Sequence, residues 1–338
     1  MRRVTGIVGA TGAVGQEFLQ VLAERRFPVG ELRLFASPRS AGQRVAFEGQ
    51  EHEVEPLDER RLGECQVAFF SAGASVSKEW APRAAARGAV VVDNSSAFRL
   101  DPEVPLVVPE VNPDAIPARA GVIIANPNCT TILLAVVLEP IRKLAGLERV
   151  VVATYQAASG AGAQAMQELE DQTRALLAGQ PEPAPRKLPQ PIAFNLFPQV
   201  DVFLPDAGDF TKEEMKVVWE TRKIMGLPDL KVVSTCVRVP VRRAHSEAVF
   251  LELERDVTVD AVRAALGVAP GVEVVDDPAT ARYPTPRQAD GRDPVLVGRL
   301  RRDPTVERGL CLFLAGDQLR KGAALNAVQI AEHVVRRG

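Results

Sequence analysis

Gly9-Ala10-Thr11-Gly12-Ala13-Val14-Gly15 follows directly on the apolar run Val4–Val8 and opens a helical pattern at Val14–Glu24. A strand, a glycine turn and a helix in this order are typical of a dinucleotide-binding βαβ unit, although the spacing is G-x-x-G-x-x-G. Glycines let the backbone approach a pyrophosphate, and the free N–H groups of the helix start face its negative charge. The alternative is an ordinary tight turn. We expect the dinucleotide to be bound by Gly9, Thr11, Gly12, Ala13 and Val14.

Working outward from this turn, short β-branched runs alternate with helical patterns over the first 127 residues, which predicts a parallel sheet covered by helices. From about residue 128 the pattern changes. A helix at Thr130–Leu144 and a long β run at Arg149–Gln156 precede two helical stretches and four longer strand-like runs. Longer strands at hairpin spacing indicate a mixed sheet. The predicted fold class is therefore α/β, with a Rossmann-like domain over residues 1–127 and an α+β domain with a mixed sheet over 128–318.

Composition limits the choice of partners. A chain of 338 residues exceeds the usual size of a single core, which favours two domains. The net charge of −2 and the pI near 6.1 give no general attraction to nucleic acid or to an anionic membrane. No apolar run approaches the length of a membrane span, and the N-terminus lacks the apolar stretch of a signal peptide. A small-molecule partner fits this chain better.

Cysteine spacing points to a reducing compartment. The four cysteines, Cys65, Cys129, Cys236 and Cys311, lie far apart with no CxxC pair, which argues against a zinc site and against a disulfide framework. We expect a cytoplasmic protein without a metal. Residues 179–198 are rich in proline and are predicted to form an extended arm, which is either a passive loop or a dimer contact.

The end of the second predicted strand indicates the cofactor. Ser37, Arg39 and Ser40 stand where an NAD enzyme carries an acidic residue for the ribose hydroxyls. A guanidinium with neighbouring hydroxyls suits a 2′-phosphate. NADP is therefore favoured over NAD, the alternative being a solvated basic loop.

Cys129 is the candidate nucleophile. Pro127 and the asparagines of Asn126-Pro127-Asn128-Cys129 mark a turn between a strand and a helix, so Cys129 falls near a helix N-terminus, where the dipole stabilises a thiolate. The other three cysteines border or lie within apolar runs and are expected to be buried. Of the three histidines, His245 stands at a strand junction and is the candidate acid/base, whereas His52 and His333 are expected to be structural or solvated.

Several stretches together resemble aspartate-semialdehyde dehydrogenase, in family order over nearly the whole chain. The related N-acetyl-glutamyl-phosphate reductases usually have glycine before the cysteine and a different serine-glycine motif, so Asn128 and the stretch Tyr155–Gly162 favour the aspartyl enzyme. The stretches are Gly9–Gly15, Asp93–Arg99, Asn126–Thr131, Tyr155–Gly162 and Cys236–His245.

The resemblance implies a fold like that of the semialdehyde and glyceraldehyde-phosphate dehydrogenases, with the terminal helix 319–338 packed on the first domain. It implies that NADPH reduces aspartyl 4-phosphate to aspartate 4-semialdehyde with release of inorganic phosphate, through a thioester on the cysteine, in lysine, threonine and methionine biosynthesis. It also implies a homodimer or a dimer of dimers. Carried over by position, the site consists of Cys129 as nucleophile, His245 as acid/base, Gln156 orienting the substrate, Arg99, Asn128, Glu213, Lys216 and Arg238 binding it, and Ser159, Gly160 and Gln318 contacting NADP.

Each of these roles has an alternative. For Glu213 and Lys216, three residues apart, it is a solvated helix pair. For the whole protein the nearest alternative is an N-acetyl-glutamyl-phosphate reductase with the same thioester chemistry. A sensor module that binds NADP without catalysis is the alternative from another class, and it would not need Cys129, Gln156 and His245 together.

Overall fold

The computed structural model describes residues 3–337 and divides them into two compact units. The first unit contains the chain up to Asn128 and the segment from Gly322, and the second contains Cys129–Lys321.

A seven-stranded sheet forms the centre of the first unit, with the strand order β3-β4-β2-β1-β5-β6-β7. All pairs are parallel except β3 with β4, which form an antiparallel pair at one edge. The inner strands are apolar along their length because helices cover both of their faces. The strands are β1 (Arg3–Val8), β2 (Val29–Ala36), β3 (Arg44–Phe47), β4 (Gln50–Pro56), β5 (Val67–Phe70), β6 (Val90–Asp93) and β7 (Val122–Ala125).

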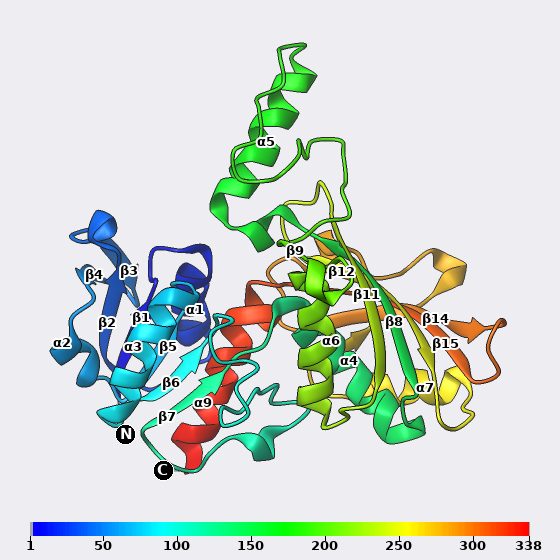
Figure 1. Ribbon diagram of the computed structural model, residues 1–338, viewed down its shortest axis with the longest axis horizontal. Coiled ribbons are helices and arrows are strands. Elements are labelled where there is room, and N and C mark those ends of the chain that lie inside the picture. The colour runs from blue at the N-terminus through cyan, green and yellow to red at the C-terminus, as the bar shows by residue number, and fades with distance from the viewer. Residues whose placement is uncertain (1–2, 338) are drawn as a thin grey trace. The chain divides into compact units, whose positions relative to one another are not determined.

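Helices α1 (Ala13–Glu24) and α9 (Leu325–Arg337) share one core with the sheet of the first unit, whereas α2 (Glu59–Gly63) and α3 (Ala74–Ala86) pack in the other (Figure 1). Phe18 of α1 and Val328 of α9 are fully buried in the first core. The Asn326 amide donates to the Val107 carbonyl over 2.9 Å and to the Asn126 side chain over 2.7 Å. The C-terminal segment is therefore an integral part of the unit that begins the chain.

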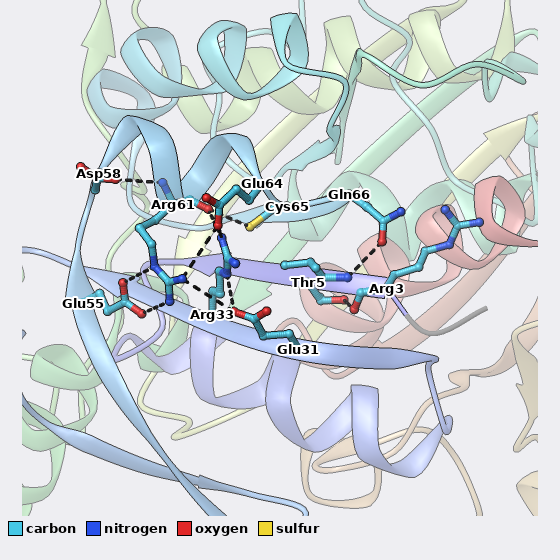
Figure 2. A network of polar contacts seen from close by, with 11 residues as sticks. Arg3, Thr5, Glu31, Arg33, Glu55, Asp58, Arg61, Glu64, Cys65 and Gln66 are labelled. Atoms are coloured by element: carbon cyan, nitrogen blue, oxygen red, sulfur yellow. Dashed lines mark hydrogen bonds and ion pairs between the residues drawn. The ribbon is translucent and has the colours of Figure 1, made fainter.

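A charged network ties β2, β4 and α2 together (Figure 2). Arg33 is only 6% exposed and pairs with Glu31 and Glu64. Arg61 makes two hydrogen bonds to Glu55, and these raise the pKa of Arg61. Glu31, Glu55 and Glu64 each contact a guanidinium, so the network links β2 to β4 and α2, two elements that hydrophobic periodicity alone did not predict.

The second unit is built on a six-stranded mixed sheet, with the order β11-β8-β12-β15-β14-β13. Strand β8 is parallel to β11 and antiparallel to β12. The mixed character expected from the sequence is confirmed. The strands are β8 (Arg149–Gln156), β11 (Lys231–Arg238), β12 (His245–Glu252), β13 (Val272–Val274), β14 (Val295–Asp303) and β15 (Gly309–Gly316).

Three helices cover one face of this sheet: α4 (Cys129–Ala145), α6 (Lys212–Met225) and α7 (Val259–Gly267). Helix α6 begins with a capping box, in which the side chains of Thr211 and Glu214 bond each other's backbone N–H groups. It ends at Gly226, whose φ of 64° suits a glycine C-cap. The capping box and the glycine C-cap thus mark the start and the end of the helix that carries Glu213 and Lys216.

The opposite face of the six-stranded sheet is apolar and partly exposed. Tyr155 is 37% and Phe250 38% exposed, and the Tyr155 ring lies 6.1 Å from that of Phe313. Directly opposite Phe250 on the neighbouring strand is Val151. A sheet face of this composition is an interaction surface rather than a solvent-facing one.

Helix α5 (Ala163–Leu177) projects away from the sheet of the second unit (Figure 1). The proline-rich segment 179–198 folds back along it. Glu168 accepts hydrogen bonds from the N–H groups of Arg186 and Lys187, and Gln172 accepts from Ile192 and Ala193. The segment is thus an ordered arm with a small core of its own, which contains Leu169, Leu188, Ile192 and Phe197.

The remaining elements are short connections. The predicted terminal helix begins differently from the expectation, with a π-helical turn at Arg320–Ala324 before α9. No helix in the described part of the chain combines the length and apolarity needed to cross a membrane. The short elements are β9 (Phe203–Leu204), β10 (Phe210–Thr211), α8 (Pro286–Ala289) and 3-10 turns at Pro38–Ser40, Pro113–Ala115, Ala158–Ala161, Pro205–Ala207 and Pro278–Thr280.

Candidate active site

Cys129 is the first residue of α4 and is partly exposed. The positive end of the helix dipole therefore acts on its sulfur and stabilises the thiolate. The other three cysteines are buried, as expected. Burial raises the pKa of the Cys65 and Cys236 thiols to about 12, and it also raises the pKa of Cys311. Of the four thiols, Cys129 thus has the surroundings of a nucleophile.

Three predicted site residues form one row across the sheet of the second unit. Arg238 on β11 pairs with Gln156 on β8, and the register of β8 with β12 places His245 beside Gln156. The three side chains are buried, at 5%, 1% and 0% exposed. Residues directly opposite each other on neighbouring strands share a face. The row therefore brings together residues that lie far apart in the sequence.

His245 contacts both the nucleophile and the backbone. Its Nε2 lies 3.6 Å from the Cys129 sulfur, and its Nδ1 accepts a hydrogen bond of 3.1 Å from the Ala157 N–H. Burial and then the charge of Arg238 lower the pKa of His245 well below its usual value. The imidazole is consequently neutral at physiological pH.

The backbone of Ala157, which bonds His245, also holds Arg238. Its guanidinium donates to the Ala157 carbonyl over 2.6 Å. Burial lowers the pKa of Arg238, while the charge of Glu213 opposes this change. A guanidinium stays charged in a protein, so a buried cation lies one strand from Gln156.

Glu213 and Lys216 on α6 belong to the same cluster. Glu213 accepts a hydrogen bond of 3.3 Å from the Gln156 amide and one of 3.0 Å from the Lys216 ammonium. Lys216 also donates to Asp201 over 2.8 Å. Burial would lower the pKa of Lys216, but the carboxylates of Glu213 and Asp201 raise it above the usual value. Glu213 is only 5% exposed, so the pair is not a solvated helix pair.

Ser159 and Gln318 bond to each other. The Gln318 amide donates to the Ser159 hydroxyl, and its carbonyl oxygen accepts from the Ala244 N–H over 2.8 Å. Ala244 precedes His245 and has a φ of 73°. This value lies in the left-handed region, which residues other than glycine rarely adopt. The two residues expected to contact the cofactor thus also hold the strained backbone that leads into His245.

Gly160 approaches the row more closely than any other residue type could. A Cβ built there would lie 2.9 Å from Cε1 of His245 and 3.1 Å from a terminal nitrogen of Arg238. A side chain at this position would push the imidazole or the guanidinium away. No pattern in the sequence indicates this packing role.

The glycine turn of the first unit fits a dinucleotide. A Cβ on Gly9 would lie 2.6 Å from the Ser71 carbonyl oxygen, and one on Gly15 would lie 2.3 Å from that of Gly9. The turn is therefore packed too closely for side chains, as a backbone cradle for a pyrophosphate requires. Thr11, Gly12, Ala13 and Val14 lie at the solvent-accessible start of α1, and Ser37, Arg39 and Ser40 lie on the turn that follows β2.

Arg99 and Asn128, the other predicted substrate contacts, are buried in the first unit. The Arg99 guanidinium donates to the backbone carbonyls of Asn126 and Asn94, over 3.0 and 2.7 Å. Arg99 thus orders the loop that leads to the nucleophile. Among the described residues, no group of three His, Cys, Asp or Glu side chains is arranged to hold a metal ion.

Sequence reasoning missed Glu247. It is fully buried two residues after His245 and opposite Thr154, and neither carboxylate oxygen has a hydrogen-bond partner. Burial raises the pKa of Glu247 well above its usual value and so favours the neutral, protonated form. A charged residue inside a strand pattern was the available signal.

A dinucleotide-binding unit joined to a mixed-sheet unit with a cysteine–histidine pair is the arrangement of semialdehyde dehydrogenases. Family models of that class match both parts: residues 4–118 match the semialdehyde dehydrogenase NAD binding domain, and residues 138–321 match the semialdehyde dehydrogenase dimerisation domain. Within this class, the chain belongs to the aspartate-semialdehyde dehydrogenase family.

The relatives cover nearly the whole chain. It is 52% identical to the aspartate-semialdehyde dehydrogenase of Aquifex aeolicus over 335 residues, which cover 98% of each protein. A crystal structure of aspartate semialdehyde dehydrogenase II from Vibrio cholerae matches with a TM-score of 0.95 and 47% identity, covering 99% of both chains. The structure of the Candida albicans enzyme with NADP matches at 25% identity and a TM-score of 0.78, covering 100% of this chain and 99% of that one. The predicted family and fold class are confirmed.

Proposed function

We propose that the protein reduces aspartyl 4-phosphate to aspartate 4-semialdehyde with release of inorganic phosphate, as an NADP-dependent aspartate-semialdehyde dehydrogenase. The observation that carries the proposal is the position of the Cys129 sulfur, at the start of α4 and 3.6 Å from His245. The names of the relatives identify the substrate class. The reaction belongs to amino-acid biosynthesis, and we assign it to the route to lysine, by way of diaminopimelate, and to threonine and methionine.

Cys129 is the nucleophile of the proposed mechanism. Its thiolate attacks the acyl carbon, a C–S bond forms, and the C–O bond to phosphate breaks, which leaves a thioester. The glycine turn of the first unit would hold NADPH, which when bound would supply a hydride for reduction of the thioester. The C–S bond then breaks as the carbonyl re-forms, which returns the thiolate and releases the aldehyde.

The buried row and its neighbours bind the substrate in this proposal. The planar fork of Arg238 suits the α-carboxylate, and Glu213 suits the α-amine. Gln156 holds the acyl group near the sulfur, and His245 acts as the acid/base. Lys216, Arg99 and Asn128 bind the phosphate end. The depth of Arg238 and Gln156 in the sheet supports a small substrate whose charged groups are fully enclosed.

The cofactor is proposed to be NADP, bound at Gly9, Thr11, Gly12, Ala13 and Val14 through its pyrophosphate. Arg39, with Ser37 and Ser40, would contact the 2′-phosphate, and Ser159, Gly160 and Gln318 would contact the nicotinamide end. The NADP complex of the Candida albicans relative supports this choice. Arg39→Ala should raise KM for NADP about ten- to hundredfold, the value of one charge-assisted hydrogen bond, and leave KM for NAD unchanged. Equal losses with both cofactors would contradict the assignment.

A homodimer is proposed on the exposed face of the six-stranded sheet. Tyr155, Phe250 and Phe313 form its apolar centre, and the family model that matches the second unit describes a dimerisation domain. Phe250→Glu should convert the dimer into monomers in analytical ultracentrifugation, because a charge would be buried without a partner. The four free cysteines support a reducing cytoplasm as the location.

The proposed reaction is tested by phosphate-dependent reduction of NADP with aspartate semialdehyde. N-acetyl-glutamate semialdehyde serves as the control substrate, and Cys129→Ala serves as the control variant. Preference for aspartate semialdehyde by several orders of magnitude in kcat/KM is expected. Preference for the acetylated substrate would identify the related reductase instead, and NADP binding without turnover of either substrate would indicate a sensor.

A further inference from the structure

Glu214, the third residue of α6, connects the start of that helix to strand β11. We infer that Glu214 is a positioning residue, whose carboxylate fixes α6 against β11 and so sets the separation of Glu213, on the helix, and Arg238, on the strand. The inference rests on the proposed function, in which Glu213 binds the α-amine and Arg238 the α-carboxylate of the substrate. Glu214 acts through these two residues.

Each carboxylate oxygen of Glu214 has its own backbone partner. Oε2 accepts a hydrogen bond of 2.6 Å from the Thr211 N–H, which closes the capping box. Oε1 accepts one of 3.0 Å from the Cys236 N–H, which belongs to β11. A capping box needs only the first of these bonds. The second bond therefore ties the first turn of the helix to a strand that lies 22 residues further along the chain.

The outer side of β11 is held by side chain and backbone contacts. It is an edge strand of the six-stranded sheet, so its outer backbone groups need partners from elsewhere. Glu214 provides one for the Cys236 N–H, and the Ser234 hydroxyl adds a contact of 3.5 Å with the Glu214 carbonyl. Two residues beyond Cys236, the Arg238 N–H donates to the Phe197 carbonyl over 2.9 Å. The strand is thus fixed along the stretch that leads to Arg238.

Burial makes the link between helix and strand rigid. The Glu214 side chain is only 7% exposed, and Cys236 is fully buried. A buried N–H that loses its acceptor also loses the compensation for its desolvation, so this bond is costly to break. Val217 and Val218, in the next turn of α6, are buried as well. The helix therefore cannot slide along β11 without breaking a buried bond and repacking an apolar face.

The chemistry of the substrate makes the separation of helix and strand important. In an α-amino acid the carboxylate and the amine are attached to the same carbon atom, so the residues that bind them must keep one fixed separation. Arg238 is on β11 and Glu213 is on α6, and Glu214 joins these two elements directly. A misplacement of about 1 Å in such a site can cost about 10²-fold in rate.

Two variants of Glu214 remove the link in different ways. Glu214→Gln has the same length, but its amide offers one acceptor oxygen for two N–H groups. Glu214→Asp keeps the charge and is one methylene shorter, so it cannot reach both partners. Thr211→Val is the matched control, because it removes the hydroxyl that accepts from the Glu214 N–H and leaves the two carboxylate bonds in place.

The first measurement is hydrogen exchange resolved to single residues by mass spectrometry, which needs no substrate. The Cys236 amide should be protected in wild type and in Thr211→Val. It should exchange about tenfold faster in both Glu214 variants, the value of one hydrogen bond. Exchange at the wild-type rate in the Glu214 variants would show that the link does not hold the strand, and it would overturn the inference.

The second measurement compares two substrates. Succinate semialdehyde is aspartate semialdehyde without the α-amine, so its binding does not use Glu213. Both Glu214 variants should lower kcat/KM about 10²-fold for aspartate semialdehyde and less than about tenfold for succinate semialdehyde. Thr211→Val should lower the melting temperature and keep kcat/KM near that of wild type with both substrates.

The possible kinetic results separate positioning from other roles of Glu214. Equal losses with the two substrates would indicate general structural damage and would overturn the inference. Wild-type kinetics in Glu214→Asp together with a loss in Glu214→Gln would show that the charge matters and not the position, which would also overturn it. Wild-type protein that fails to reduce NADP with aspartate semialdehyde would reject the proposed function instead, and the hydrogen-exchange result would still decide whether Glu214 joins α6 to β11.

Discussion

The glycine turn of the first unit and the buried row of the second unit solve the problem of holding a ligand in opposite ways. The turn Gly9–Gly15 is one continuous segment that would bind a dinucleotide through its backbone, and Gly9 and Gly15 are required because a Cβ on them would lie 2.6 and 2.3 Å from a backbone oxygen. The row of Arg238, Gln156 and His245 joins three strands, and here side chains would bind the ligand. A local change should therefore damage only cofactor binding in the first region, whereas a change at one point of the row should damage the chemistry of all its members.

The largest effect is expected from Cys129→Ala. Turnover should fall by on the order of 10⁶-fold, as when an enzyme loses a nucleophile that acts with its partner as a unit. Affinity for NADP, measured by fluorescence titration, should stay near that of wild type because the turn does not depend on this residue. Turnover of the variant within tenfold of wild type would rule out the thioester.

Gly160→Ala tests the row with a single methyl group. The added Cβ would lie within 3.1 Å of both His245 and Arg238, so one of them must move. We expect kcat to fall about 10²-fold, the cost of a misplacement of about 1 Å, with little loss of thermal stability. Gly162→Ala is the neighbouring control: no atom lies within 4 Å of its added Cβ, although its φ of 95° adds backbone strain. Higher KM for NADP with unchanged kcat in Gly160→Ala would mean that the glycine serves the cofactor alone.

Gly15→Ala is the corresponding change in the turn. Its Cβ would overlap the carbonyl oxygens of Gly9 and Ala10, and relief of this overlap should cost roughly 1–3 kcal/mol. We expect NADP affinity to fall about ten- to hundredfold, while alkylation of Cys129 by iodoacetamide in the absence of cofactor proceeds at the wild-type rate. Slower alkylation would show that the two regions are not independent.

The smallest effect concerns stability and involves Glu247, in the row behind His245. Its pKa is raised in the folded protein, so between its ordinary value of 4.5 and the folded-state pKa the folded protein binds a proton that the unfolded chain has released. Stability should therefore fall as pH rises through this window, by about 1.4 kcal/mol per pH unit. Urea unfolding of wild type and Glu247→Gln, measured in steps upward from pH 4.5, should show that wild type alone loses stability with rising pH through this window. Parallel pH dependences would contradict a buried neutral acid.

Much of the fold followed from the sequence because the strongest signals were local. Strand β8 has the predicted bounds, and α4 differs from the prediction by one residue at each end. The hairpin of β3 and β4 was missed because its strands are short, largely polar and mostly exposed, and therefore have little hydrophobic periodicity. The π-helical start of the C-terminal segment was missed for a related reason, since five-residue turns have no sequence period of their own.

The residue types of the candidate site could be proposed from the sequence, whereas the hydrogen bonds that orient them could not. Cys129 and His245 were found by their context, but the Ala157 peptide that orients His245 has no distinguishing side chain. Gln318 and Ser159 are predicted to contact NADP, and the structure adds a hydrogen bond between them and one from the Ala244 N–H to Gln318. Such contacts depend on strand register across the sheet, which a linear pattern does not contain.

The contrast among the four thiols has a practical consequence for chemical probes. An electrophile reacts with thiolate, and at pH 7 the buried Cys65 and Cys236, with a pKa of about 12, carry on the order of one thiolate in 10⁵ molecules. The partly exposed Cys129 therefore gives the folded protein one addressable sulfur. A fluorophore or cross-linker that carries a mild electrophile should therefore react with Cys129 at a stoichiometry of about one. The other three cysteines need not be replaced for such labelling.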